Sequence, residues 1–402
     1  MIHKPKIELI ERHPGLAPSA TVLMTIAAGL AVANVYAIQP LLEVVGRSLA
    51  LGPAHFGLLV TVTQAGYALG LLLLVPLGDR LDRRRLIVWQ MALSALALAA
   101  VAMAGTVMAL LVSLFAMGLL AVTVQTLVAY AGALAAPERR GAVVGTVTSG
   151  VIIGILAARF VSGGIGDVGG WRAVYWVLAA ASCVIALLLS RTLPPDSGAR
   201  EKLTYAAVLR WLPRTFMQDA ILRRSALFAF VIFATFSIFW TSMALPLTGS
   251  PHHLSHGQVG LFGVLGLAGA LGARRAGVLA DAGRAAWVTG GAFVLLCLSW
   301  LAIAMLEVGL PWLGAGILML DLAVQAIHVT SQGVIVNRHP DATSRAIAGY
   351  MMFYSLGSAM GGALSTWAYA IAGWNGVCLA GGGVSLGGLL LWALMLARRR
   401  SL

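Results

Sequence analysis

The chain has 402 residues, of which 60% are apolar and only 10% are charged. A typical soluble domain is nearer half apolar and a quarter charged, and a soluble fold has too much surface to hide this much apolar area. The composition therefore excludes a cytosolic enzyme, a secreted disulfide scaffold and a disordered chain. A net charge of +13 on a soluble protein would suggest nucleic-acid binding, so its meaning here depends on where the charges lie.

Apolar segments with few charges, each about 18 residues or longer, follow one another along the chain, which is typical of membrane helices. Open strands would leave unpaired backbone groups in lipid, so we predict an all-α membrane protein. The predicted helices are twelve and cover residues 19–41, 55–77, 86–104, 107–135, 142–164, 172–190, 224–247, 258–280, 285–306, 311–336, 346–370 and 375–397.

Basic residues concentrate in alternate loops between these segments. Of the 27 Lys and Arg residues, 24 lie in the termini and loops of one side, two (Arg47 and Arg172) lie in the opposite loops, and Arg159 lies inside the fifth helix. The positive-inside rule then places both termini in the cytoplasm, and an even number of spans agrees with it. The charge therefore orients the helices in a lipid bilayer and does not indicate a nucleic-acid partner.

The longest hydrophilic stretch divides the helices into two groups of six, and landmarks recur across it. Gly170-Trp171 is matched by Gly373-Trp374, and Asp79 by Asp281, at offsets of about half the chain. We predict two related six-helix bundles, residues 1–190 and 224–402, joined by a cytoplasmic central loop, 191–223, with a partly amphipathic segment from about residue 201 to about residue 220.

The loop after the second helix reads Gly78-Asp79-Arg80-Leu81-Asp82-Arg83-Arg84-Arg85. It resembles the signature loop of the major facilitator superfamily, G-x-x-x-D-R-x-G-R-R, although Val75 and Asp82 stand where that pattern has glycines. Residues 34–41 and 344–362 resemble bacterial drug or sugar efflux proteins of the proton-antiporter type, whereas helix 5 lacks the proline of the antiporter signature. The resemblance implies the twelve-helix fold of two pseudo-symmetric bundles, a bacterial inner membrane location, and a cavity lined by helices 1, 4, 7 and 10.

The same loop supplies a predicted conformational gate. The Asp79 carboxylate can pair with the positive N-terminus of a neighbouring helix, which the resemblance implies is helix 11. Asp281 recurs at the matching place in the second half, while Arg80 and Arg83 have Glu138 and Asp341 as candidate partners. The alternative is that this basic loop only sets the topology.

Glycines at fourfold spacing mark predicted close helix contacts. They either join the halves, where the resemblance places helix 2 against 11 and helix 5 against 8, or serve ordinary helix packing. The pairs are Gly66/Gly70, Gly150/Gly154 and Gly357/Gly361.

Helix 10 carries a stripe of polar side chains, Asp321, Gln325, His328 and Gln332. The spacing of 4, 3 and 4 residues places them on one helical face. Ionisable groups are costly inside a membrane and are functional candidates by default. A carboxyl group in a low-dielectric cavity favours its protonated form, so we predict that Asp321, with or without His328, couples to protons. The alternative is a structural polar seam between helices.

Arg159 in helix 5 is the other costly residue. It snorkels to the membrane surface, or it binds an anionic group, or it pairs with a carboxylate such as Asp321. Asn34 in helix 1 and Gln125 in helix 4 add hydrogen-bonding groups on helices that the resemblance places at the cavity.

Aromatic side chains in helices 7 and 11, among them Trp240 and Tyr354, either fill the core or face the cavity. In the second case they favour a bulky, partly apolar substrate.

The sequence has no phosphate-binding glycine loop, zinc signature or nucleophile elbow in a loop, so we predict no enzymatic activity, no cofactor and no metal. His252, His253 and His256 have no visible metal-binding partner, and Ser255 with Gln258 instead predicts a capping box. The predicted function is a monomeric, proton-coupled secondary transporter that exports small, partly apolar compounds. The alternatives are import of a polar or anionic metabolite, with Arg159 as its counter-ion, and a non-transport membrane sensor.

Overall fold

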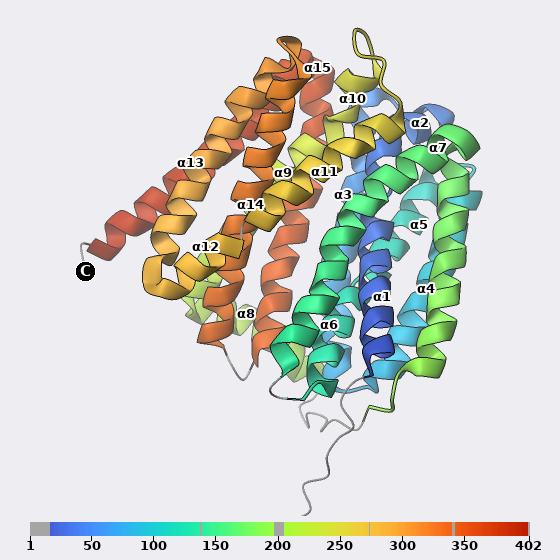
Figure 1. Cartoon of the computed structure of the whole chain (residues 1–402), viewed down its shortest axis with the longest axis vertical. Helices are drawn as coiled ribbons and strands as arrows, with labels where there is room; N and C mark the ends of the chain where they lie inside the picture. The colour runs from blue at the N-terminus through green and yellow to red at the C-terminus, as the bar shows by residue number, and fades with distance from the viewer. Residues whose placement is uncertain (1–16, 137–138, 197–204, 273, 340–341, 401–402) are drawn as a thin grey trace, which may run out of the picture.

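The computed structural model is built from helices that run between two ends of the molecule (Figure 1). It describes residues 17–136, 139–196, 205–272, 274–339 and 342–400, without the side chains of residues 79, 208, 270, 274, 281, 344 and 398–400. Most loops with arginines lie at one end, which we call the basic end, and the turns at Gly170 and Gly373 lie at the opposite end. Residues up to 196 are called the first half and residues from 220 the second half.

In the first half, apolar segments form the helices, and short polar residues cap several of them. Asp82 accepts a hydrogen bond from the Arg85 backbone N–H at 3.0 Å, and Thr106 accepts one from Ala109 at 3.2 Å. The elements are α1 (Pro18–Tyr36), η1 (Gln39–Leu41), α2 (Leu42–Ser48), η2 (Pro53–His55), α3 (Gly57–Leu73), η3 (Val75–Asp79), α4 (Arg83–Met103), α5 (Val107–Leu120), α6 (Thr123–Leu134) and α7 (Arg140–Thr192).

The second half repeats this arrangement after a connecting helix. Ser255 and Gln258 form the predicted capping box, since the Ser255 N–H donates to Gln258 Oε1 at 2.8 Å and the Gln258 N–H donates to Ser255 Oγ at 3.2 Å. The elements are α8 (Tyr205–Gln218), α9 (Ala220–Ser242), α10 (Ala244–Thr248), α11 (His256–Gly272), α12 (Arg274–Leu279), η5 (Ala280–Arg284), α13 (Ala285–Ala304), η6 (Met305–Glu307), α14 (Leu310–Arg338) and α15 (Thr343–Arg400).

The helices fit the twelve predicted crossings. Nine helical segments among the described residues are long and apolar enough to span a membrane, and two of them have 53 residues. A straight helix of that length would extend roughly 80 Å, whereas the hydrocarbon core of a bilayer is about 30 Å thick. Both bend back at a glycine with positive φ, Gly170 at 74° and Gly373 at 57°. Helices α11 and α12 together cover the remaining predicted segment, so the all-α, twelve-helix fold is confirmed.

The two halves use the same helix contacts. A Cβ added at Gly66 would meet the backbone of Phe115 and Leu119 in α5, and one at Gly269 would meet the backbone of Leu318 and Leu322 in α14. Each residue of the first set lies 203 positions before its counterpart in the second. The glycines therefore allow the same close backbone approach twice.

The glycine pairs found in the sequence serve packing within each half. Gly150 and Gly154 lie against Thr25 and Gly29 of α1, and Gly357 and Gly361 lie against Phe230 and Ala234 of α9. Other positions bring the halves together, where α3 meets α15 and α7 meets α11. There Gly57 faces Gly362, and Gly163 and Gly260 lie against the backbone of the facing helix. The predicted helix pairs meet, but through different glycines.

Asp219 fixes the start of α9 at the basic end. Its Oδ1 accepts hydrogen bonds from the backbone N–H groups of Ile221 and Leu222, at 2.7 and 3.2 Å. Its Oδ2 lies 2.9 Å from His339 Nε2 and 3.5 Å from Arg338 Nε, at the end of α14. Burial on its own raises the pKa of Asp219, but the two backbone hydrogen bonds and the neighbouring basic groups outweigh it, so the pKa is lowered.

This lowered pKa predicts an acid-sensitive contribution to stability. It is fully present above the ordinary Asp pKa of 3.8 and is lost as the pH falls through the lowered value, because the protonated acid is a poorer cap. We expect Asp219→Asn to keep the cap and lose this pH dependence, and Asp219→Ala to lose about 1 kcal/mol of stability near neutral pH as well. Thermal melting in detergent across acidic pH measures both effects. An unchanged acid dependence in Asp219→Asn would contradict the assignment.

Candidate functional site

The halves are held together at the opposite end by hydrogen bonds. Between α3 and α15, the Gly57 N–H donates to Thr366 Oγ1 at 3.0 Å, and the Thr61 hydroxyl donates to the Ala359 carbonyl at 2.7 Å. The Asp167 carboxylate of α7 accepts from the backbone N–H groups of His256 and Gly257, at 3.2 and 2.9 Å, and so caps α11 of the other half. This end is therefore closed.

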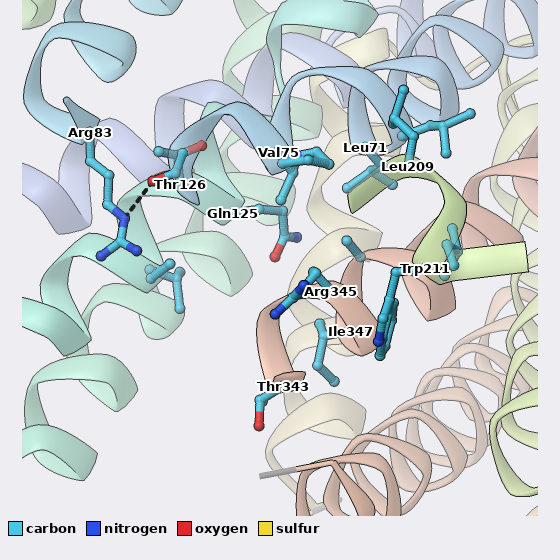
Figure 2. Close-up of a pocket in the computed structure, with 17 residues that line it drawn as sticks. Leu71, Val75, Arg83, Gln125, Thr126, Leu209, Trp211, Thr343, Arg345 and Ile347 are labelled. Atoms are coloured by element: carbon cyan, nitrogen blue, oxygen red, sulfur yellow. Dashed lines mark hydrogen bonds between the residues drawn. The ribbon is translucent and has the colours of Figure 1, made fainter. Parts of the chain in front are cut away.

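A cavity of about 170 Å³ lies between the halves at the basic end. Figure 2 shows Gln125 of α6 and Arg345 of α15 directed toward it from opposite sides, with Trp211 of α8 beside Arg345. The Arg345 guanidinium carbon lies 5.5 Å from the centre of the Trp211 ring. The remaining wall is mostly apolar and includes Leu71 and Ile347. The cavity thus has walls from both halves and from the connecting helix.

Helix α8 bridges the halves at the mouth of this cavity. The Tyr205 hydroxyl donates to the Leu73 carbonyl of the first half at 2.6 Å. On the other side, the rings of Phe216 and Phe353 stack with centres 4.9 Å apart. The described part of the predicted amphipathic segment, residues 205–218, is therefore a helix with contacts to both halves.

Arg159 lies in an aromatic cage deeper between the halves. Its side chain is buried, so the snorkelling interpretation is wrong. The guanidinium carbon lies 3.7 Å from the ring centre of Trp240, 5.4 Å from that of Phe236 and 5.6 Å from that of Tyr36. Arg159 Nε donates to Gln39 Oε1 at 3.1 Å, while its Nη2 has no hydrogen-bond partner among the described residues. Cation–π contacts with several rings offset part of the cost of burying the charge.

Asp321 of α14 lies against the same cage from the second half. A Cβ added at Gly266 of α11 would lie 2.8 Å from Asp321 Oδ2 and 3.2 Å from Trp240 Cζ2. Arg159 and Asp321 act on each other electrostatically, but their charged atoms form no ion pair within 4.0 Å in the described part of the chain. Asp321 Oδ2 and Trp240 Nε1 are both buried, and neither makes a hydrogen bond of standard geometry with a described residue, although the indole N–H lies close enough to stabilise the carboxylate. The cage therefore gathers a carboxylate, an indole N–H and a guanidinium N–H at one place between the halves.

A second aromatic layer lies between the cage and the basic-end cavity. The hydroxyls of Tyr36 and Tyr354, one from each half, are hydrogen-bonded to each other. Phe233 lies against Tyr354, with ring centres 3.6 Å apart. His328 Nδ1 lies 2.9 Å from the Tyr350 hydroxyl and its ring packs on Phe233. Trp240 and Tyr354 therefore face the interface between the halves.

The polar stripe of helix 10 does not act as one group. Asp321 lies at the cage, whereas His328, two turns further along, lies in the second aromatic layer. Gln325 is half-buried between them, and Gln332 lines a different pocket beside Gly277. Asn34 donates from Nδ2 to Ser182 Oγ at 3.5 Å inside the first half, and Gln125 donates to the Tyr67 hydroxyl at 3.5 Å at the edge of the cavity.

The predicted gate is described only in part. The side chains of Asp79 and Asp281, and residues Glu138 and Asp341, lie outside the described part of the structure. Arg80 is exposed, whereas Arg83 lines the basic-end cavity and donates from Nε to the Gly78 carbonyl at 2.9 Å. The Arg83 backbone N–H also donates to Asp196 Oδ2 at 3.0 Å. Arg83 therefore joins the loop to the end of the first half.

Sequence reasoning missed Tyr36, Gly266 and the contact of Trp211 with the cavity. The repeat contains a signal for Gly266. At an offset of 203 residues, Gly266 corresponds to Thr63, and Asp321 corresponds to Gly118. In the first half, Gly118 lies against Thr63. In the second half the glycine is on the other helix of the pair: Gly266 of α11 lies against Asp321 of α14, and its missing side chain makes room for the carboxylate.

The sequence matches the family model of the Major Facilitator Superfamily over residues 24–343 and 226–402. It is 46% identical to an uncharacterized transporter of Escherichia coli O157:H7, YgaY, over 94% of this chain and 95% of that protein. A Streptomyces coelicolor protein described as a transporter, SCO4007, is 33% identical over 90% of this chain and 84% of its own length.

Solved structures share the fold at low sequence identity. A bacterial homologue of the human lysosomal transporter Spinster, in an inward-facing and occupied conformation, has a TM-score of 0.76 at 14% identity, covering 96% of this chain and 97% of that one. The human organic anion transporter MFSD10 has a TM-score of 0.65 at 18% identity, covering 94% of this chain and 100% of that one. These likenesses concern the fold.

The space beside Asp321 depends on Gly266, and this gives a testable prediction. We expect Gly266→Ala to lower stability by about 1–3 kcal/mol, because the added methyl group overpacks the contact with Asp321 and Trp240. Gly263→Ala on the same helix is the control, since its nearest neighbour is the flexible end of Leu156. Melting temperatures in detergent compare the two variants. Equal effects would show that Gly266 has no special role at this contact.

Proposed function

Since the chain belongs to the Major Facilitator Superfamily, we propose that it is a proton-coupled secondary transporter that moves small, partly apolar compounds by alternating access. The observation that carries this proposal is the burial of Arg159 and Asp321, one from each half, in an aromatic cage at their interface. Among the described residues they are the only buried Arg, Lys, Asp or Glu side chains. Ionisable groups this costly mark the substrate and proton pathway in membrane proteins.

The two ends of the molecule support the alternating-access part of the proposal. The opposite end is closed by direct hydrogen bonds, while the basic end carries the cavity between the halves. Under the positive-inside rule the basic end faces the cytoplasm, so we propose an inward-facing state in the inner membrane with both termini cytoplasmic. Residues 1–190 and 224–402 would then rock against each other, joined by the segment between them.

Within this scheme we assign three roles. Asp321 carries the proton. Gln325 and His328 lie further along the same helix, toward the basic-end cavity. Arg159, Trp240, Tyr354 and Gln125 belong to the substrate site and its approach, whereas Asn34, which the sequence also suggested, bonds to Ser182 inside the first half. Asp79, Arg80, Arg83 and Asp281 form the gate at the cytoplasmic end, as the signature loop suggests. A monomer contains every part of this mechanism, and protons and the small-molecule substrate are its partners.

The direction of transport has two candidates. The resemblance to efflux proteins favours export of partly apolar compounds. The buried Arg159 guanidinium, whose Nη2 has no described hydrogen-bond partner, favours import of an anionic metabolite. A compound panel tested in right-side-out and everted vesicles separates the two.

Removal of the proton carrier tests the proposal. In proteoliposomes with an imposed pH gradient, we expect the wild-type protein to move protons when a transported compound is added. Asp321→Asn should reduce this movement to the level of empty liposomes, because the amide cannot bind and release a proton. The control is Glu307→Gln, which neutralises an exposed carboxylate. Wild-type proton movement in Asp321→Asn would refute the role of Asp321.

A further inference from the structure

The charges at the cage limit which substrates bind there. Arg159 and Asp321 are its charged residues, and the described elements that pack around them add only uncharged groups. Helix α9 contributes Trp240, α1 contributes Tyr36, and α11 contributes glycines. The other titratable groups nearby are the tyrosine hydroxyls, which keep their protons at neutral pH, and His328 two turns along α14.

The state of Asp321 sets the net charge of the cage. When its carboxylate is ionised, it balances the guanidinium of Arg159. When it is protonated, the cage keeps one buried positive charge, which is costly in apolar surroundings unless an anion balances it. A bound anion and a proton on Asp321 therefore stabilise each other. A cation would bind better without the proton, so the two kinds of substrate predict opposite coupling.

The donors of Arg159 are arranged for such an anion. Gln39 accepts from Nε and the Trp240 ring covers a face of the guanidinium, while Nη2 is buried without a described partner. A charge-assisted hydrogen bond from a guanidinium to an oxyanion is among the strongest in proteins. The Nη2 donor of Arg159 is thus available to a carboxylate or sulfonate oxygen.

The size of the spaces limits the body of the ligand. The space at Arg159, between Gln39, Trp240 and Val259, is about 10 Å³, so a ligand enters only when the cage widens. The basic-end cavity, which the second aromatic layer separates from the cage, is about 170 Å³, close to the roughly 150 Å³ of an apolar cavity that holds benzene. Tyr36, Phe236 and Trp240 offer ring faces and edges on which a flat group packs.

We propose that the substrate is a compact anion with a single flat apolar group, such as an aryl carboxylate or sulfonate, and that it crosses together with a proton. Its acidic group binds Arg159 while the proton sits on Asp321, and release of both returns the cage to neutrality. This proposal rests on the proposed role of Asp321, and it favours symport and hence uptake along an inward proton gradient.

A binding experiment with matched probes tests the charge preference. Benzenesulfonate stays anionic at all the pH values used, benzenesulfonamide is its neutral counterpart, and benzylamine is a cation of similar size. The melting temperature of the full-length protein in detergent is measured with each probe at about pH 5.5 and about pH 7.5, on either side of neutrality. We expect benzenesulfonate to stabilise the wild-type protein most, and more strongly at the lower pH.

Two variants locate the effect. Asp321→Asn, which mimics the protonated acid, should keep the stabilisation by benzenesulfonate and lose its pH dependence. Arg159→Gln should lose the preference for benzenesulfonate over the sulfonamide. In proteoliposomes, a benzenesulfonate gradient should carry protons in the same direction as the anion.

The outcomes separate this inference from the proposed function. Preference for benzylamine, no preference for the anion, or proton movement opposite to the anion overturns the inference. If the pH dependence persists in Asp321→Asn, then Asp321 is not the proton carrier and the proposed function fails as well. If the pH dependence requires Asp321 but the cation binds best, only the anionic substrate class is wrong.

Discussion

The structure depends on one electrostatic constraint: a guanidinium and a carboxylate are buried between two apolar halves. Charges cost several kcal/mol to bury, and the cost is offset only by nearby opposite charge, hydrogen bonds or ring faces. Arg159 and Asp321 come from different halves, so each half supplies the opposite charge that offsets the cost of the charge buried in the other half. The aromatic rings around them provide apolar surroundings, in which the two charges interact more strongly than in water.

The repeat explains how a symmetric frame holds an asymmetric site. The backbone contacts of Gly66 with α5 recur for Gly269 with α14, 203 positions later. At the same offset, Asp321 corresponds to Gly118 and Arg159 to Gly362. Gly118 and Gly362 allow close helix contacts with Thr63 and Val60. Each charged residue therefore occupies a position where the other half uses a glycine for packing.

Hydropathy and charge predict the fold because they report an averaged property, the free energy of placing a segment in lipid. The membrane helices follow from it, and so do the breaks between residues 164 and 172 and between residues 370 and 375, where the structure bends at Gly170 and Gly373. The site depends on individual contacts between distant helices. Sequence spacing placed Asp321 and His328 on one face, but depth along the helix separates them, and only the fold brings Tyr36 and Gln39 to Arg159. The packing glycines show the same limit, because their spacing in the sequence predicts a close helix contact but not which helix lies opposite.

The cap that Asp167 forms on α11 has an energetic consequence for the closed end. Two backbone amides of one half are satisfied by a carboxylate of the other, so separating the halves there leaves a helix N-terminus to be hydrated. Helix caps contribute about 1 kcal/mol, which changes an equilibrium between two states roughly fivefold. A bond of this strength biases the population toward the closed end without locking it. In the proposed alternating-access cycle, the ratio of the two conformations at rest would thus depend in part on whether the N-terminus of α11 is bound by water or by the Asp167 carboxylate.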